Sequence, residues 1–291
     1  MPNNIVLAEN YVKLLDEVYR NATATADLIA PAELVRAGSN AKTVLYPMIS
    51  LNGLGDYDRN SGYTDNSVNV SWEEIAFTYD RGTKISVDTM DNQESFDIAF
   101  GRAGAELIRT KVVPEGDAYT FATIAGKEGI SKTATGETYS TGADFLSALA
   151  AAQSKMDEDE VPFENRILYA TPTLMRMVAT LDTTKSREIL DSFAKVVKVP
   201  QSRFYTQIDL LDGKTSGELD GGYKKATDGN EINFLIVHKD AIVKIDKHIV
   251  SNVISPDMNP NADSHILKYR KYGEVDVMKN KRAGVYLSYK E

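Results

Sequence analysis

The chain has 291 residues, of which 42% are hydrophobic, so it is long enough to bury one large core or two modest ones. It contains no cysteine, which excludes disulfides, thiolate nucleophiles and cysteine-ligated zinc or iron–sulfur sites. The formal net charge of −9 argues against a dedicated nucleic-acid-binding protein, because such proteins usually carry a basic surface.

The charge is distributed unevenly along the chain. Residues 56–94 contain nine acidic and three basic residues, a net of −6, whereas residues 239–291 contain ten basic and seven acidic residues, a net of +3. Two interpretations stay open. The two stretches are simply solvated faces, or they are complementary surfaces through which one copy of the chain attracts another.

The N-terminal part predicts an arm followed by a hairpin. A short amphipathic helix is predicted over residues 9–20, and a stretch without helical pattern follows at 21–26. The glycine- and aspartate-rich stretch 51–63 opens a long predicted β-hairpin. Two alternating runs come after it: Val68, Val70 and Trp72, then Ile75, Phe77 and Tyr79. Because a two-stranded ribbon is marginally stable in water, the hairpin must rest on its own domain or on a neighbouring subunit.

The middle of the chain predicts helices. The longest covers about 91–126 and is bent or restarted at Pro114, whose ring removes a backbone N–H and clashes with the preceding turn. A second helix is predicted over 143–156, with Thr141 as its N-cap and a buried stripe formed by Phe145, Leu149, Ala152 and Met156. Further predicted elements are a strand at 166–170, a helix that begins at Pro172 and a helix at 186–198.

The C-terminal part predicts strands. Residues 210–230 carry three Asp-Gly pairs, which favour tight turns, so this stretch is expected to be a surface loop or hairpin. Residues 232–237 predict a buried strand, and 266–289 predict two strands joined around 280–284. Strands, then helices, then strands indicate an α+β chain. We expect the long helix to pack across a sheet formed partly by the C-terminal strands.

No catalytic motif is visible in the sequence. It lacks a phosphate-binding P-loop, a nucleophile elbow and an HExxH zinc motif. The histidines His238, His248 and His265 are scattered, and Asp56 and Asp58 lie among glycines, where aspartate favours turns. We therefore expect no enzyme activity, no cofactor and no metal. The alternative of another class is a metal-dependent enzyme that uses this Asp-x-Asp pair with a converging histidine.

Membrane and export signals are also missing from the pattern. The longest apolar runs fall far short of the ~20 residues that span a bilayer. The start of the chain shows no basic segment followed by an apolar one. We expect no membrane contact and a protein that is made and stays in a cytoplasm.

Several blocks of the sequence resemble one family. The blocks are 45–47, 53–59 and 62–63, then 80–82, 85–88 and 90–91, then Val113-Pro114-Glu115-Gly116-Asp117-Ala118-Tyr119, and finally 269–286. Together they resemble the major capsid proteins of tailed double-stranded DNA phages of low-GC Gram-positive hosts. The block at 113–119, inside the predicted long helix, is the most specific, and residues 140–230 are the least diagnostic.

The resemblance implies the Hong Kong ninety-seven type capsid fold, an α+β fold with an arm, an extended hairpin loop, a spine helix, a peripheral-domain sheet and an axial domain. It divides the chain into an N-terminal arm (1–45), the extended loop hairpin (46–90), the spine helix with the start of the peripheral domain (91–135), the axial domain (136–240) and C-terminal strands that return to the peripheral domain (241–291).

The same resemblance implies a structural protein. Identical copies would form the hexamers and pentamers of an icosahedral phage head that encloses double-stranded DNA, assembled in the host cytoplasm and found in the virion. The implied partners are a separate scaffolding protein, a portal, an optional decoration protein, and packaged DNA through non-specific contacts. An encapsulin-like protein nanocompartment shell is the alternative within the fold.

The predicted inter-subunit contacts are aromatic and arginine side chains of the hairpin region, because such side chains dominate binding energy at interfaces. They are Tyr57, Arg59, Tyr63, Trp72 and Arg81. For Trp72, packing inside its own subunit is the open alternative. Residues 43–83 contain no lysine, so we do not expect a lysine-derived isopeptide cross-link from the hairpin tip.

Overall fold

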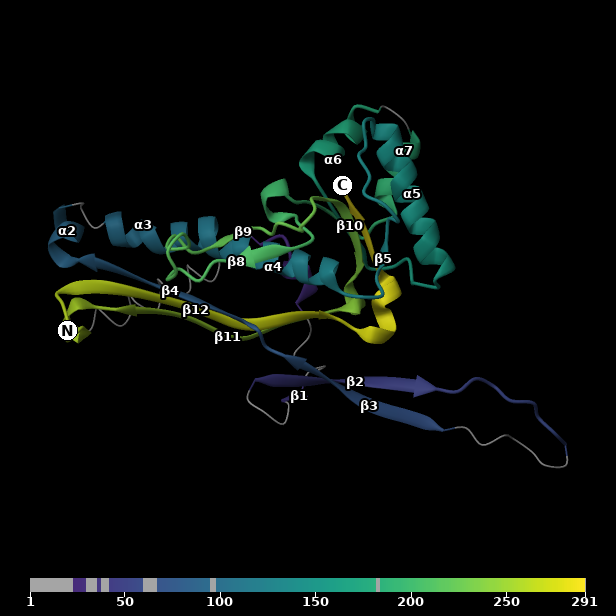
Figure 1. Cartoon of the computed structure of the whole chain (residues 1–291), viewed down its shortest axis with the longest axis horizontal. Helices are drawn as coiled ribbons and strands as arrows, with labels where there is room; N and C mark the ends of the chain where they lie inside the picture. Colours follow the sequence, from purple (N-terminus) through teal and green to yellow (C-terminus); the bar gives the residue numbers. More distant parts are fainter. Residues whose placement is uncertain are drawn as a thin grey trace.

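The computed structural model describes residues 23–29, 36–37, 42–59, 67–94, 98–181 and 184–290. The helix predicted at 9–20 and Tyr63 lie outside these residues. The chain combines helices with mainly antiparallel sheets, and β6 and β7 are a parallel pair connected through helices, so the α+β prediction is confirmed. Figure 1 shows an elongated molecule, with a long sheet beneath a row of helices, a second helix-covered sheet at one end, and a hairpin on the far side of the long sheet.

The long sheet is antiparallel and has the strand order β11-β12-β4. Its strands are β4 (Tyr79–Asp88), β11 (Ile242–Ile254) and β12 (Ser264–Val277). Gly82 permits the close approach of β4 to β12, because a Cβ at this position would lie 2.9 Å from the backbone oxygen of Tyr269. The sequence predicted β12 but gave no indication of β11.

A long helix lies along one face of the long sheet (Figure 1). Its parts are α3 (Ile98–Leu107), a π-helical turn (Ile108–Val112) and α4 (Val113–Gly126), with α2 (Thr89–Glu94) before them. The π-turn ends next to Pro114, so the interruption predicted there is confirmed. Ile108 and Val113 pack on Leu267 and Tyr269 of β12, which confirms the predicted packing of the helix on a C-terminal strand.

The second sheet has five strands in the order β5-β13-β10-β6-β7. These are β5 (Ser131–Lys132), β6 (Arg166–Ala170), β7 (Lys195–Lys198), β10 (Ile232–His238) and β13 (Val285–Tyr289). Its helices are α5 (Gly142–Glu158), α6 (Pro172–Ala179) and α7 (Thr184–Asp191). Thr141 caps α5 in a reciprocal capping box with Asp144, and the predicted apolar stripe of α5 is fully buried, so both predictions are confirmed.

The hairpin belongs to a third sheet, with the order β1-β2-β3. Its strands are β1 (Arg36–Ala37), β2 (Thr43–Leu51) and β3 (Val68–Ala76). The predicted pairing of two runs after residue 62 is wrong. Ile75 lies inside β3, whose partner is β2, whereas β4 leaves the hairpin and pairs with β12. Alternation indicates a half-buried strand but does not specify its partner, which explains the error.

The structure tests three further predictions in the second half of the chain. The helix predicted at 186–198 is wrong beyond Asp191, because the β-branched pair Val196 and Val197 extends along β6 as strand β7. The C-terminal strands β12 and β13 exist as predicted but lie in different sheets. The hairpin within 210–230 is confirmed as β8 (Ile208–Leu210) and β9 (Tyr223–Lys225).

Short 3₁₀ turns complete the described part: Ala26–Leu28, Gln201–Arg203, Lys239–Ala241, Pro256–Met258 and Lys279–Gly284.

Candidate assembly surface

The β2–β3 hairpin presents a continuous apolar face to solvent. Directly paired residues of an antiparallel ladder lie on the same face of the sheet. The apolar hairpin face consists of the pairs Pro47 and Trp72, Ile49 and Val70, and Leu51 and Val68. Its aliphatic and indole side chains are between 43% exposed, for Trp72, and 67% exposed, for Leu51. Contiguous exposed apolar side chains of this kind mark interaction sites.

The opposite face of the hairpin is buried at its base. Val44 pairs with Ile75, and Tyr46 and Ile75 pack against Val243 of β11. Toward the tip this face carries Met48, Ser50, Asn69 and Ser71. The buried base therefore holds the hairpin against the long sheet, and the apolar hairpin face points away from that support.

The structure brings Trp72 together with the aliphatic side chains of the apolar hairpin face. Tyr57 and Arg59 lie nearer the tip, in the exposed segment that follows β2, and are not part of this face. Tyr63 lies outside the described residues. The inter-subunit contacts of these four residues stay predictions.

Arg81 has partners within its own subunit. Its Nε donates to Glu115 Oε1 at 2.7 Å and its Nη2 donates to the backbone oxygen of Gly222 at 3.1 Å. The hydrogen bond from the guanidinium to the Glu115 carboxylate raises the pKa of Arg81. Arg81 thus ties β4 to the long helix and to the β8–β9 loop, and its predicted contact with a neighbour stays a prediction.

The side chains considered for metal binding are not clustered. Asp56 and Asp58 are exposed near the hairpin tip, whereas His238 ends β10 and His248 lies in β11. Within the described ranges, no group of three or more His, Asp or Glu side chains is placed to hold a metal ion. The helices of the same ranges include none long and apolar enough to cross a bilayer.

A buried carboxylate holds the last described part of the arm. Asp117 of α4 is 0% exposed and accepts hydrogen bonds from Thr23 Oγ1 at 2.6 Å and Thr25 Oγ1 at 2.8 Å. The backbone N–H groups of Ala24 and Thr25 also donate to it, at 3.0 and 3.3 Å. Arg203 Nη1 lies 3.3 Å from its Oδ2. We call residues 23–29 with Asp117 the arm anchor.

Lys244 of β11 completes the arm anchor from the other side. Its Nζ donates to Thr25 Oγ1 at 2.6 Å, and Ile29 forms a parallel β-bridge with it. Burial, reinforced by the charge of Lys271, lowers the pKa of Lys244 to about 8. Lys271 is itself paired with Asp246 at 3.1 Å. The arm is thus fixed where it meets both the long helix and the long sheet.

The sequence contained a signal for the arm anchor that was not used. Asp117 lies four residues from both Val113 and Phe121, so it interrupts the apolar stripe of a helix. Lys244 likewise interrupts an apolar run in β11. Because an unpaired buried charge is costly, a charge in such a stripe predicts a partner, although the sequence does not say which one.

No protein-family model matches the sequence, and no curated protein matches it either. Solved structures do match. The capsid of the cyanophage P-SCSP1u shares 15% identity with this chain, with a TM-score of 0.60 over 93% of this chain and 88% of that one. This chain has the phage capsid fold. The capsid of Myoviridae phage XM1 is also similar, with 11% identity and a TM-score of 0.58 over 91% of this chain and 90% of that one.

The phage capsid fold is not confined to those two matches. A virus-like particle from Pyrococcus furiosus shares 10% identity and has a TM-score of 0.59 over 97% of this chain and 99% of that one. At identities this low, the TM-scores of 0.58 to 0.60 establish a shared fold. The resemblance indicated by the sequence blocks is confirmed at that level, and the likeness is to structural proteins of capsids.

Proposed function

We propose that this chain is a structural shell protein whose copies assemble into the hexamers and pentamers of an icosahedral phage head enclosing double-stranded DNA. The observation that carries the proposal is the apolar hairpin face: among the residues that the structure describes, the hairpin packs on its own subunit through the opposite face, at the base. The phage capsid fold supports it. In this proposal the hairpin is the extended loop, α3 to α4 the spine helix and the five-stranded sheet the core of the axial domain.

The proposed receptor for the hairpin is the long sheet of a neighbouring copy. Lys84 pairs directly with Lys268, on the face turned away from the long helix, and like charges directly opposite each other are unfavourable. Asp56, Asp58 and Glu74 are exposed acidic residues of the hairpin. An acidic hairpin laid over the neighbour's lysine pair would neutralise both surfaces and cover the apolar hairpin face.

The wider setting follows from the same proposal. The protein would act in the virion after assembly in the host cytoplasm, with a scaffolding protein, a portal, an optional decoration protein and non-specific DNA contacts as partners. It would have no enzymatic role and no cofactor. Tyr57, Arg59, Tyr63, Trp72 and Arg81 remain the proposed contact residues, with Trp72 the strongest because it lies in the apolar hairpin face.

The second candidate is an encapsulin-like nanocompartment shell. It is favoured by the likeness to the Pyrococcus furiosus virus-like particle, which extends over nearly the whole of both chains. Both candidates require a closed protein shell, and they differ in what the shell encloses.

The experiment is negative-stain electron microscopy combined with light scattering on the chain expressed alone and then with its neighbouring genes. We expect capsomers or closed shells. A strictly monomeric protein at high concentration, even beside a scaffolding protein, would contradict both candidates. Nuclease-protected DNA inside the shells would favour the phage head, whereas a protein cargo without DNA would favour the nanocompartment.

A further inference from the structure

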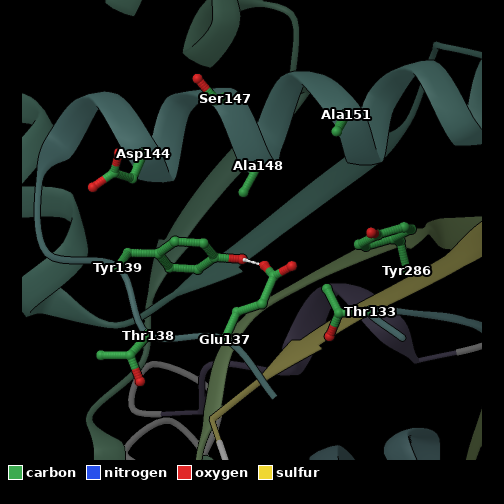
Figure 2. Close-up of a pocket in the computed structure, with 9 residues that line it drawn as sticks. All are labelled: Thr133, Glu137, Thr138, Tyr139, Asp144, Ser147, Ala148, Ala151 and Tyr286. Carbon is green, nitrogen blue, oxygen red and sulfur yellow. Dashed lines mark hydrogen bonds between the residues drawn. The ribbon is translucent and has the colours of Figure 1, made fainter. Parts of the chain in front are cut away.

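A pocket of about 440 Å³ lies between α5 and the five-stranded sheet. Figure 2 shows its lining, which comes from one flank of α5, from the segment after β5 and from β13. The residues that matter here are Glu137, Tyr139, Asp144, Ala148, Ala151 and Tyr286. Ala148 and Ala151 lie on the same flank of α5, and their side chains are small enough to leave room for the pocket between the helix and the sheet. We call it the α5 pocket.

Glu137 is presented to the α5 pocket from a fixed backbone. Its backbone N–H donates to the backbone oxygen of Tyr289 at 2.8 Å, and its own backbone oxygen accepts from Asn233 Nδ2 at 2.7 Å. The Tyr139 hydroxyl hydrogen-bonds to the Glu137 carboxylate and lies 2.9 Å from Ser288 Oγ. A carboxylate held in this way is already oriented before any ligand arrives.

Two tyrosine rings flank the carboxylate. In Figure 2 the rings of Tyr139 and Tyr286 lie on either side of Glu137. The ring of Tyr139 packs against Phe145 with the centroids 5.8 Å apart, and the ring of Tyr286 stacks on Phe234 at 6.1 Å with an interplanar angle of 9°. Both rings are therefore anchored in the core, and they bring aromatic surface to the α5 pocket.

The α5 pocket is negatively charged. Glu137 and Asp144 are its ionisable carboxylates, and none of its lining residues is a lysine or arginine. Within the described part of the chain, the ion pairs include neither carboxylate, and their hydrogen-bond partners include the hydroxyls of Tyr139 and Thr141. Burial and the neighbouring Glu137 raise the pKa of Tyr139, so its hydroxyl stays protonated near neutral pH. Carboxylates beside aromatic faces favour a cation that has an apolar stem.

We propose that the α5 pocket binds an alkylammonium or guanidinium group. Glu137 accepts the charged hydrogen bond, Asp144 adds negative potential at the N-terminal end of α5, and the rings of Tyr139 and Tyr286 contact the cation and the methylene stem beside it. The group is supplied either by a free amine or by a lysine or arginine side chain of another copy. This proposal goes beyond the shell function and does not depend on it.

The test is isothermal titration calorimetry on the full chain with n-butylamine, agmatine and the neutral analogue n-butanol. We expect saturable binding of both cations and none of n-butanol. Glu137→Gln should weaken the binding by about tenfold or more, the loss of one charge-assisted hydrogen bond. Tyr286→Leu should weaken it by about threefold, the loss of one cation–π contact. Glu188→Gln, which neutralises an exposed carboxylate of α7, is the matched control and should bind like the wild type.

Light scattering with and without n-butylamine then identifies the source of the cation. If the amine lowers the association of the chain, a neighbouring copy supplies a lysine or arginine; if association is unchanged, the α5 pocket takes a free amine. No saturable binding of either cation, equal binding of n-butanol, or wild-type affinity in both Glu137→Gln and Tyr286→Leu would overturn the proposal. Circular dichroism of each variant checks that it folds.

Discussion

At the scale of single residues, the arm anchor concentrates two buried charges at one point. Asp117 accepts hydrogen bonds from the hydroxyl and backbone groups of residues 23–25, and Lys244 donates to Thr25. Buried charges are tolerated when they are paired and hydrogen-bonded, and removing a partner is costly. The arm is therefore held at this point by polar contacts rather than by apolar burial alone.

Asp117→Asn should destabilise the protein. The amide nitrogen cannot accept the hydrogen bonds that the second carboxylate oxygen receives, so we expect a loss of about 3 kcal/mol in the free energy of unfolding. Urea denaturation measures it, and limited proteolysis should detect release of the arm. Asp228→Asn changes an exposed aspartate and serves as the control. An unchanged unfolding midpoint in Asp117→Asn would rule out the anchoring role.

Because the pKa of Lys244 is lowered in the folded chain, the free energy of unfolding should rise with pH. Its pKa is about 8 in the folded chain and 10.5 in its unperturbed form. Between these values the unfolded chain binds the extra proton, so the folded state gains stability as the pH rises, by up to about 3 kcal/mol. Unfolding in urea between about pH 7.5 and 9.5, below the range where tyrosines titrate, measures the slope. Lys244→Met should remove it, and equal slopes for both proteins would contradict the prediction.

At the scale of elements, the hairpin is fixed at one end and offers one face. Tyr46 and Ile75 are buried at its base, whereas Trp72 and Val70 lie on the apolar hairpin face. Exposure of apolar side chains carries a free-energy cost that burial against a neighbour removes. In the proposed shell, the hairpin is therefore the element that contact with a neighbouring copy would complete.

Trp72→Ala should weaken assembly without destabilising the monomer. A buried interface tryptophan typically contributes about 2 kcal/mol or more, so the subunit association constant should fall about thirtyfold. Light scattering measures association and urea denaturation measures stability. Asn69→Ala, on the opposite face of β3, is the matched control. Wild-type association in Trp72→Ala would exclude Trp72 as an interface anchor.

At the scale of the whole molecule, opposite charges of the hairpin region and of the C-terminal part are only partly paired within one subunit, where Lys279 lies 2.6 Å from Glu73 of β3. The hairpin region is acidic, whereas Lys84, Lys268 and Arg270 lie along the open face of the long sheet. Arg270 is paired with Asp80 at 2.6 Å, whereas the two lysines form no ion pair with the other described residues. The charges that are not paired within the subunit favour association between copies.

Association should therefore weaken as salt is added. Raising the ionic strength from about 0.1 M to about 1 M shortens the Debye length from about 10 Å to about 3 Å. Light scattering across this range should show a falling association constant, and Lys268→Glu should lower it at low salt. Lys225→Glu, on β9, makes the same charge change away from the open face. If salt leaves association unchanged, the electrostatic part of the proposed contact is wrong.

The elements best predicted from the sequence were those with a local signal. The cap of α5 at Thr141, its buried stripe, and strands β6 and β10 all matched. Prediction failed at 195–198, where pairing with β6 overrode a helical pattern. It also failed at the hairpin, where the partner of β3 is β2, the strand before it in the chain. Of the predicted contact residues, Trp72 lies in the apolar hairpin face, whereas Arg81 bonds to Glu115 inside its own subunit.

The sequence by itself determined most of the helices and several of the strands, the absence of cysteine chemistry, and blocks typical of capsid proteins. These features depend on residue type and on periodicity, which are local. Only the tertiary structure decided that β4 pairs with β12, that Asp117 and Lys244 meet at residue Thr25, and that the apolar hairpin face is left to solvent. The physical reason is that alternation shows that one face of a strand is buried, while strand partners and buried-charge partners are set by packing between segments far apart in the chain.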